Sequence, residues 1–204
     1  MIKKSKLVCK MGINDSDYVT MKEVVTTDEN GKKKRKVVWK CPFYEGWAAM
    51  LKRCYSEKLQ KRCPTYKGCS VCQEWLTFSN FKAWMEKQDW EGKHLDKDIL
   101  YQGNKIYSPE TCVFVDQKVN VFLVESNTSN GAYMIGVHLK KTTNKFAAMC
   151  NINGKQKHLG YFNTELEAHK AWLHCKFIQA RILAAEQADP RVAKALVERY
   201  ENYK

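Results

Sequence analysis

The pattern of apolar and polar positions is clearest in residues 134–139, 145–152 and 155–162, three runs rich in β-branched and aromatic residues. Runs of this length and composition are typical of β-strands. Asn153-Gly154 separates the last two runs, and both residues tolerate the positive φ angles of a two-residue hairpin. We therefore predict a three-stranded antiparallel sheet that ends in a tight hairpin.

A helix is expected to follow this sheet directly. Thr164 stands three residues before Glu167, the spacing at which a hydroxyl and a carboxylate reciprocally satisfy free backbone donors at a helix start. The apolar stripe of this helix is predicted to cover one sheet face; it comprises Leu166, Ala168, Ala171, Trp172 and Cys175. The other face stays open, with several lysines around it: Lys140, Lys141, Lys145, Lys155 and Lys157.

Nearer the N-terminus, residues 18–27 and 34–40 alternate apolar and polar positions around Glu29-Asn30-Gly31, which predicts a second hairpin. Lys34 and Arg35 lie in its basic GKKKRK run, which either contacts phosphates or is a solvated tip. Two aromatic stripes then recur at helical spacing and predict core helices. Their members are Trp47, Met50, Leu51 and Cys54, and then Trp75, Phe78, Phe81, Trp84 and Met85.

Residues 94–120 predict a short strand, a polar loop containing Gly103-Asn104, a second strand over 112–115, and a helix. A last helix is predicted to begin at Asp189-Pro190, because proline lacks only a donor that is already unpaired there. Its apolar stripe of Val192, Leu196 and Tyr200 either docks on the preceding helix, which we favour, or pairs two protomers.

The fold class that follows is α+β. A small strand-strand-helix module with surrounding helices precedes the three-stranded antiparallel sheet and its helix, and a C-terminal helix closes the chain. With 204 residues there is room for two small modules. We expect an N-terminal extension with a basic hairpin over 1–41, the strand-strand-helix module over 42–126, the sheet domain over 131–180 and a helical tail over 181–204.

Charge narrows the class of partner. Lysine and arginine number 35 against 22 acidic residues, a formal net charge of +13. Such a chain binds polyanions through release of counterions, a contribution that falls steeply with salt. The sequence contains neither a signal peptide nor an apolar run of membrane-spanning length, so we expect a cytoplasmic protein that binds double-stranded DNA, without membrane or small-molecule partners. Its oligomeric state is not readable from the sequence.

The nine cysteines include four within nineteen residues, Cys54, Cys63, Cys69 and Cys72, which end in a C-x-x-C. Thiolates at that closing spacing suit tetrahedral zinc. The first pair lacks the usual ligand spacing, however, and reduced cysteine is often a small buried apolar residue. We therefore expect core cysteines in preference to a structural zinc site.

The sheet segment resembles the Apetala-2/ethylene-response-factor DNA-binding domain. Gly136-Val137, residues 145–148, Leu159-Gly160-x-Phe162, Thr164 and Glu167-Ala168 carry the resemblance. It implies that the sheet enters the major groove, where a β-ribbon fits. The positions that would contact bases and phosphates are His138, Lys140, Asn151, Gln156 and His158, and Lys145 adds charge to the same sheet. Arginines and a tryptophan of the family are replaced here, so no sequence preference carries over. A small core with a solvated basic face is the alternative.

The segment from Trp47 to Pro109 resembles phage HNH-like homing endonucleases that carry such a tail. Trp47, Arg53-Cys54-Tyr55, Gly68-Cys69, residues 95–98 and Tyr107-Ser108-Pro109 are among the matching residues. The resemblance implies a metal-dependent DNA endonuclease that would act in the cytoplasm of a bacteriophage host. Asp96 matches the carboxylate ligand and Asn120 the helix ligand of one hard cation, for which oxygen donors indicate Mg²⁺ or Mn²⁺.

Lys97 replaces the histidine that serves as general base in that family, and a lysine is protonated near neutral pH. Residues two apart on a strand share a face, so His94, Asp96 and Asp98 are expected to line up, and His94 or Asp98 would act as base or further ligand. Asn104 matches the loop asparagine that orients the histidine.

Three functions remain open. The chain is a homing-type endonuclease, a non-catalytic sequence-specific DNA-binding protein such as a repressor or a domesticated nuclease, or an inhibitor that binds a protein partner.

Overall fold

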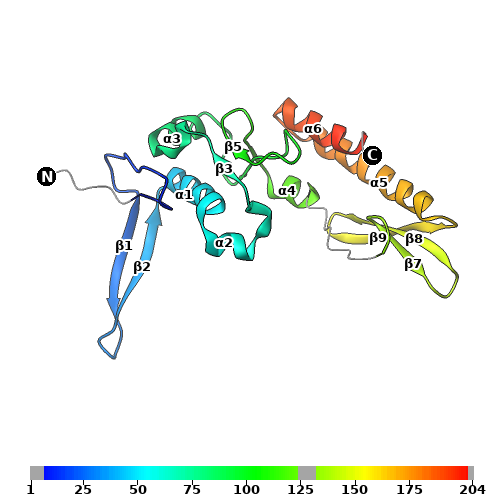
Figure 1. The fold of residues 1–204 in the computed structure, drawn as a ribbon, viewed down its shortest axis with the longest axis horizontal. Coiled ribbons are helices and arrows are strands. Elements are labelled where there is room, and N and C mark those ends of the chain that lie inside the picture. Colours follow the sequence, from blue (N-terminus) through cyan, green and yellow to red (C-terminus); the bar gives the residue numbers. More distant parts are fainter. Residues whose placement is uncertain (1–6, 124–131, 202–204) are drawn as a thin grey trace. The chain divides into compact units, whose positions relative to one another are not determined.

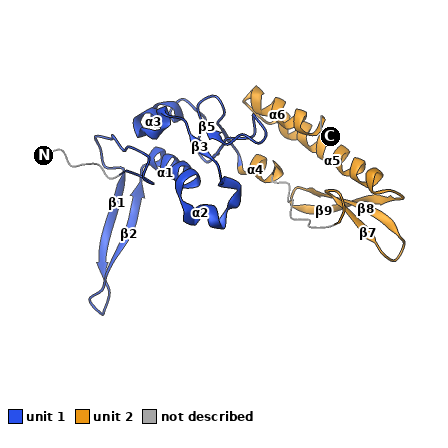
Figure 2. Ribbon diagram, in the orientation of Figure 1, with its two compact units in different colours: residues 1–116 blue, residues 117–204 orange. Residues whose placement is uncertain are grey.

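The computed structural model describes residues 7–123 and 132–201 as an α+β fold, as predicted (Figure 1). The chain divides into two compact units, Met1–Asp116 and Gln117–Lys204 (Figure 2). None of the described helices is both long enough and apolar enough to cross a membrane.

Unit 1 begins with the predicted hairpin. β1 (Met21–Thr27) and β2 (Lys33–Lys40) pair antiparallel, and Gly31 takes a positive φ of 75° in the connecting turn. Helices then dominate the unit, and the elements are α1 (Pro42–Tyr55), α2 (Glu57–Arg62), the 3-10 turns Pro64–Tyr66 and Glu74–Leu76, and α3 (Phe78–Met85).

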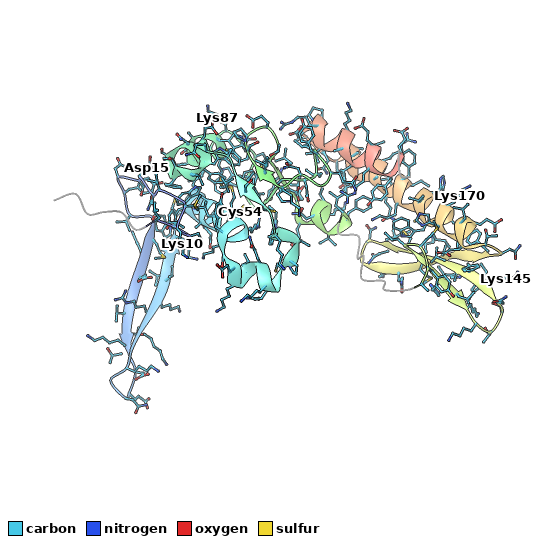
Figure 3. All side chains as sticks on the ribbon, in the orientation of Figure 1. Lys10, Asp15, Cys54, Lys87, Lys145 and Lys170 are labelled. Atoms are coloured by element: carbon cyan, nitrogen blue, oxygen red, sulfur yellow. The ribbon has the colours of Figure 1, made fainter. Side chains whose placement is uncertain are left out.

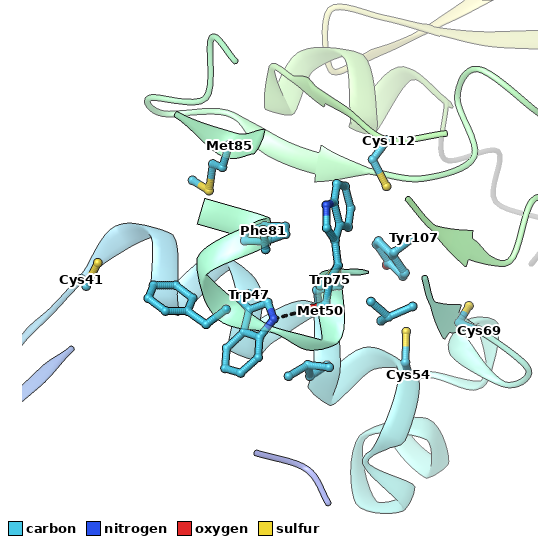
Figure 4. Packing of buried hydrophobic residues seen from close by; sticks show 13 residues of the cluster. Cys41, Trp47, Met50, Cys54, Cys69, Trp75, Phe81, Met85, Tyr107 and Cys112 are labelled. Carbon is cyan, nitrogen blue, oxygen red and sulfur yellow. Dashed lines mark hydrogen bonds between the residues drawn. The ribbon is translucent and has the colours of Figure 1, made fainter. Parts of the chain in front are cut away.

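The core of unit 1 forms where the two aromatic stripes meet, and Figure 4 shows this packing. Trp47 is fully buried on α1, and its indole Nε1 donates a 2.7 Å hydrogen bond to the carbonyl of Trp75. Both predicted stripes are confirmed as core, since their residues are buried and Trp84 is partly buried against them. The carbonyl of Trp75 also supplies the hydrogen-bond acceptor that the buried Trp47 indole needs.

The strand-strand-helix order predicted for residues 94–120 is confirmed. β4 (His94–Asp96) pairs antiparallel with β6 (Val113–Val115), and α4 (Gln117–Leu123) follows in the chain. The structure adds a parallel pair that the sequence did not predict, β3 (Ser70–Val71) with β5 (Ile106–Tyr107). By its contacts α4 belongs to unit 2, so the division between the units falls inside the span predicted for this module.

Unit 2 contains the predicted three-stranded sheet in the order β7-β8-β9, formed by Val137–Lys140, Lys145–Ile152 and Lys155–Phe162. Asn153 and Gly154 have φ angles of 52° and 77°, so the tight turn is confirmed. Helix α5 (Glu165–Ala185) begins with the predicted capping box of Thr164 and Glu167.

The apolar stripe predicted on α5 is right except at its first residue. Ala168 and Trp172 are buried, whereas Leu166 is 51% exposed. Leu166 lies in the first helical turn, one residue after the helix begins at Glu165, and its side chain is turned to solvent away from the sheet.

Helix α6 (Pro190–Glu201) is predicted to dock within the chain, and this is confirmed. Val192, Leu196 and Tyr200 are at most 4% exposed and pack within unit 2. Lys176 of α5 donates a 2.8 Å hydrogen bond to the carbonyl of Phe122 near the end of α4, and its ammonium lies 3.8 Å from the Phe122 ring centroid. One lysine therefore connects α4 with α5.

Candidate functional site

The three-stranded sheet presents one open face, which its register defines. Residues paired directly across antiparallel strands project to the same face. Lys140 pairs with Lys145, and Asn151 pairs with Gln156. The alternation along the strands adds the remaining positions. We call this surface the open face; its exposed members are His138, Lys140, Lys145, Asn151, Gln156, His158 and Tyr161.

The opposite face of the sheet packs on helix α5. Val137 and Ala148 pair across the strands and are buried against Ala168. Cys150 is buried against Trp172 further along β8. Because α5 covers this face, all six DNA-contact positions predicted on the sheet lie together on the face that solvent reaches. Lys145 lies at the β7-β8 end of the sheet, and Lys170 projects from α5 (Figure 3).

Tyr161 is a member of the open face that the sequence did not reveal. His158 and Tyr161 are three residues apart, so regular alternation would place them on opposite faces. The register shifts between Ala148 and Met149 because Leu159 is an extra residue on β9, and this bulge returns Tyr161 to the face of His158. Gly160 beside it, with a φ of 147°, is the only sequence signal of that bulge.

Tyr161 connects two predicted contact residues. Its hydroxyl accepts a 2.9 Å hydrogen bond from Lys140 Nζ, and the same ammonium lies 4.7 Å from the ring centroid. The His158 ring lies 4.5 Å from the tyrosine ring, centroid to centroid. A cation, a phenol and an imidazole therefore form a continuous row across the open face, which offers both charge and flat apolar surface.

Lys34 and Arg35, the predicted contact residues outside the sheet, lie next to each other on β2. As strand neighbours they project to opposite faces of the hairpin. Lys34 Nζ lies 3.5 Å from Asp28, and the Arg35 guanidinium lies 4.0 Å from Glu23.

The second candidate site lies at the end of β4. His94 is exposed and Asp96 is half-buried on the same strand. Asp96 Oδ1 accepts 2.8 Å hydrogen bonds from the backbone N–H groups of Asp98 and Ile99. The predicted alignment of three residues on one strand face is therefore wrong for Asp98, because β4 ends at Asp96 and the chain turns over its carboxylate.

Asp96 and Asp98 are nevertheless neighbours through that turn. Burial raises the pKa of Asp96, and the adjacent Asp98 carboxylate raises it further, against the two backbone hydrogen bonds that lower it. Two adjacent carboxylates are the kind of group that holds a hard divalent cation or shares a proton.

Lys97 lies between these two acidic residues in the chain and is buried. Its Nζ donates to Asp98 Oδ2 at 3.1 Å and to the carbonyl of Asn104 at 3.0 Å. Both contacts are charge-assisted hydrogen bonds from the lysine ammonium to oxygen acceptors. Lys97 therefore ties the Asp98 carboxylate to the backbone of the following loop.

Asn104 holds the loop that follows β4. Its Nδ2 donates to the carbonyls of Lys97 at 2.6 Å and Ile106 at 2.7 Å, and its Oδ1 accepts from the N–H of Ile106 at 3.2 Å. The asparagine thus bonds to the backbone of the residue after Asp96, and the role that the resemblance implies for it stays a prediction.

Arg53 is a residue of this site to which the sequence assigned no role. Its Nη1 donates a 3.3 Å hydrogen bond to the carbonyl of Leu95, and Asp96 attracts its guanidinium. The sequence signal was its place in the Arg53-Cys54-Tyr55 stretch that carries part of the resemblance. A cation is thereby added next to the carboxylate pair.

Asn120, the second predicted metal ligand, lies on α4 in unit 2, whereas Asp96 lies in unit 1. Their joint role stays a prediction. Within residues 7–123 and 132–201, no three histidine, cysteine, aspartate or glutamate side chains are grouped as a metal centre.

Two of the four cysteines considered for zinc, Cys54 and Cys69, are buried in the core of unit 1 (Figure 4). Cys63 and Cys72 are half-buried. Burial and the nearby Cys69 raise the pKa of the Cys54 thiol to about 12, which disfavours the thiolate that zinc requires.

No protein-family model, curated protein sequence or solved structure matches this chain.

Proposed function

We propose that this chain binds double-stranded DNA through the open face of its β7-β8-β9 sheet. The observation that carries the proposal is the gathering of all six predicted sheet contacts on one exposed face while α5 covers the other. Lysines of this face would neutralise phosphates, and the amide side chains of Asn151 and Gln156 would meet base edges. The formal net charge of +13 favours the same partner.

Fluorescence anisotropy with labelled duplexes of mixed sequence, measured across a salt series, tests this proposal. Lys140→Ala/Lys145→Ala removes two charges from the open face, whereas Lys155→Ala/Lys157→Ala removes two from residues that pair with Ile152 and Cys150 on the helix side. We expect the open-face variant to lower the slope of log affinity against log salt by about 2, and the matched variant to change it less. Equal losses in both variants would overturn the assignment to this face.

A second candidate function is metal-dependent hydrolysis of DNA at the end of β4, as in a homing-type endonuclease. The neighbouring carboxylates of Asp96 and Asp98 favour it, since oxygen donors fit Mg²⁺ or Mn²⁺. When bound, such an ion would neutralise charge on the scissile phosphate. Asp96 and Asp98 would hold it, and the exposed His94 would take the proton of the attacking water.

Supercoiled plasmid DNA incubated with Mg²⁺ or Mn²⁺ separates the two functions. A nuclease gives metal-dependent nicked or linear product that Asp96→Ala abolishes while the affinity for DNA persists. If wild type and Asp96→Ala bind equally and neither cuts a broad panel of target sequences, the chain is a binding protein. If the chain does not bind DNA even at low salt, neither function holds, and a protein partner is the alternative that is left.

A further inference from the structure

The β1-β2 hairpin has no core of its own. None of its fifteen strand residues is buried, and the exposed ones include Val25 at 53%, Val38 at 54% and Trp39 at 43%. Side chains project from both of its faces (Figure 3). An isolated two-stranded ribbon is only marginally stable in water. Exposed apolar surface of this extent indicates a site of interaction with a partner.

The two faces of the ribbon differ in charge. Lys22 pairs with Trp39, Val24 with Lys36, and Thr26 with Lys34. The register shifts between Lys22 and Glu23, because β2 has one extra residue there, Val38, that pairs with no residue of β1. This bulge places Trp39 on the same face as Lys34 and Lys36, so the three pairs share one face. We call this surface the lysine face; it comprises Lys22, Val24, Thr26, Lys34, Lys36 and Trp39.

The lysine face contains three cations and no acidic residue. The opposite face contains Lys33, Arg35 and Lys40, but it also contains Glu23, which lies 4.0 Å from Arg35. Lys40 Nζ is 3.2 Å from Glu45 of α1. On the lysine face, one of the three lysines has an acidic partner, since Lys34 Nζ lies 3.5 Å from Asp28 of the turn, whereas Lys22 lies over the Trp39 ring at 5.6 Å from its centroid. The lysine face is therefore the face whose charge is less neutralised by the protein itself.

We propose that the lysine face of the β1-β2 ribbon is a second contact surface for duplex DNA. This inference rests on the proposed function for the identity of the partner, and it adds where and with which residues the second contact is made. The three lysines neutralise backbone phosphates, and the ribbon has the width that the major groove admits. Val24 and Trp39 lie against the sugars and the groove wall, so that binding covers apolar surface that the free protein exposes.

Two charge-matched triple variants test the proposal in the full chain. Lys22→Ala/Lys34→Ala/Lys36→Ala removes all three positive charges of the lysine face. Lys33→Ala/Arg35→Ala/Lys40→Ala removes the same number of positive charges from the opposite face of the same strands. The substituted residues are all exposed, so both variants should keep the fold, which circular dichroism checks. By anisotropy we expect the lysine-face variant to lose about tenfold or more in affinity for duplex DNA near 100 mM salt, and the control to lose much less.

Trp39 gives an independent readout, because it is the one exposed tryptophan among the six in the chain, all of which are described. Duplex DNA should reduce the acrylamide quenching of wild-type fluorescence, and the difference should vanish in Trp39→Phe. Equal affinities of the two triple variants, with quenching unchanged by DNA, would overturn the ribbon contact. The open-face variants of the sheet decide the proposed function separately, because they leave the ribbon intact.

Discussion

Asn104 and Lys97 hold each other across the loop that follows β4. The asparagine side chain donates to the lysine carbonyl at 2.6 Å, and the lysine ammonium donates to the asparagine carbonyl at 3.0 Å. The pair fixes the turn that carries Asp96 and Asp98. The same lysine ammonium also donates to Asp98 at 3.1 Å, so the pair is tied to one of the two carboxylates of the loop.

Asn104→Ala should destabilise unit 1, because the carbonyls of Lys97 and Ile106 lose their amide donor. We expect a loss of about 1–3 kcal/mol in the free energy of unfolding, measured by urea denaturation. Gln102→Ala, an exposed amide of the same loop, is the control and should change stability little. Equal effects of the two substitutions would mean that the Asn104 bonds do not hold the loop.

Asp96→Asn should make stability less dependent on pH. The pKa of Asp96 in the folded state lies above its usual value of 3.8. The protonated carboxyl therefore stabilises the fold, fully below pH 3.8, and this stabilisation is lost as the pH rises through the folded-state pKa. Asparagine keeps an oxygen for the N–H groups of Asp98 and Ile99 without ionising. The stability of the variant relative to wild type should therefore increase from about pH 3 to about pH 7. A difference that shrinks over this range would show that ionised Asp96 is stabilising.

Gly136→Ala should destabilise unit 2 more than Gly154→Ala. Both glycines have positive φ, 80° and 77°. A Cβ at Gly136 would fall on the Trp172 indole, whereas one at Gly154 meets open space. We expect about 1–3 kcal/mol of additional loss at Gly136 from overpacking, measured by thermal unfolding. Similar losses at the two positions would mean that Trp172 moves aside without cost.

Chelation should leave the fold of unit 1 unchanged. The Cys54 thiol, with a pKa of about 12, is held protonated in an apolar core next to Cys69. We expect the melting temperature to be the same with and without EDTA, and elemental analysis of the purified protein to find much less than one zinc per chain. Stoichiometric zinc, with unfolding on its removal, would restore the zinc site considered for the four cysteines.

Much of the fold follows from local signals in the sequence. The Asn153-Gly154 turn and the Thr164 capping box depend on neighbouring residues alone, and both are present. The open face could be predicted as far as His158 because alternation holds up to the bulge. Tyr161 could not, because the extra residue Leu159 changes the register, and Gly160 alone does not reveal which residue is extra.

The site at β4 was harder to predict for a different reason. Asp98 was expected on the strand, but the side chain of Asp96 bonds to the following backbone N–H groups and ends the strand. Such side-chain bonds compete with the sheet ladder, and alternation alone does not show which of the two forms. The place of Lys97 depends likewise on Asn104, seven residues further along the chain.

Side-chain amide NMR shows directly whether the open face of the sheet contacts duplex DNA, because Asn151 and Gln156 lie on that face. In ¹⁵N-labelled full-length protein titrated with a duplex, the NH₂ signals of Asn151 and Gln156 on the open face should shift, whereas those of Gln179 and Gln187, on and just beyond α5, should stay in place. Shifts confined to the two glutamines of the helical side, or no shifts under conditions where anisotropy detects binding, would contradict the claim.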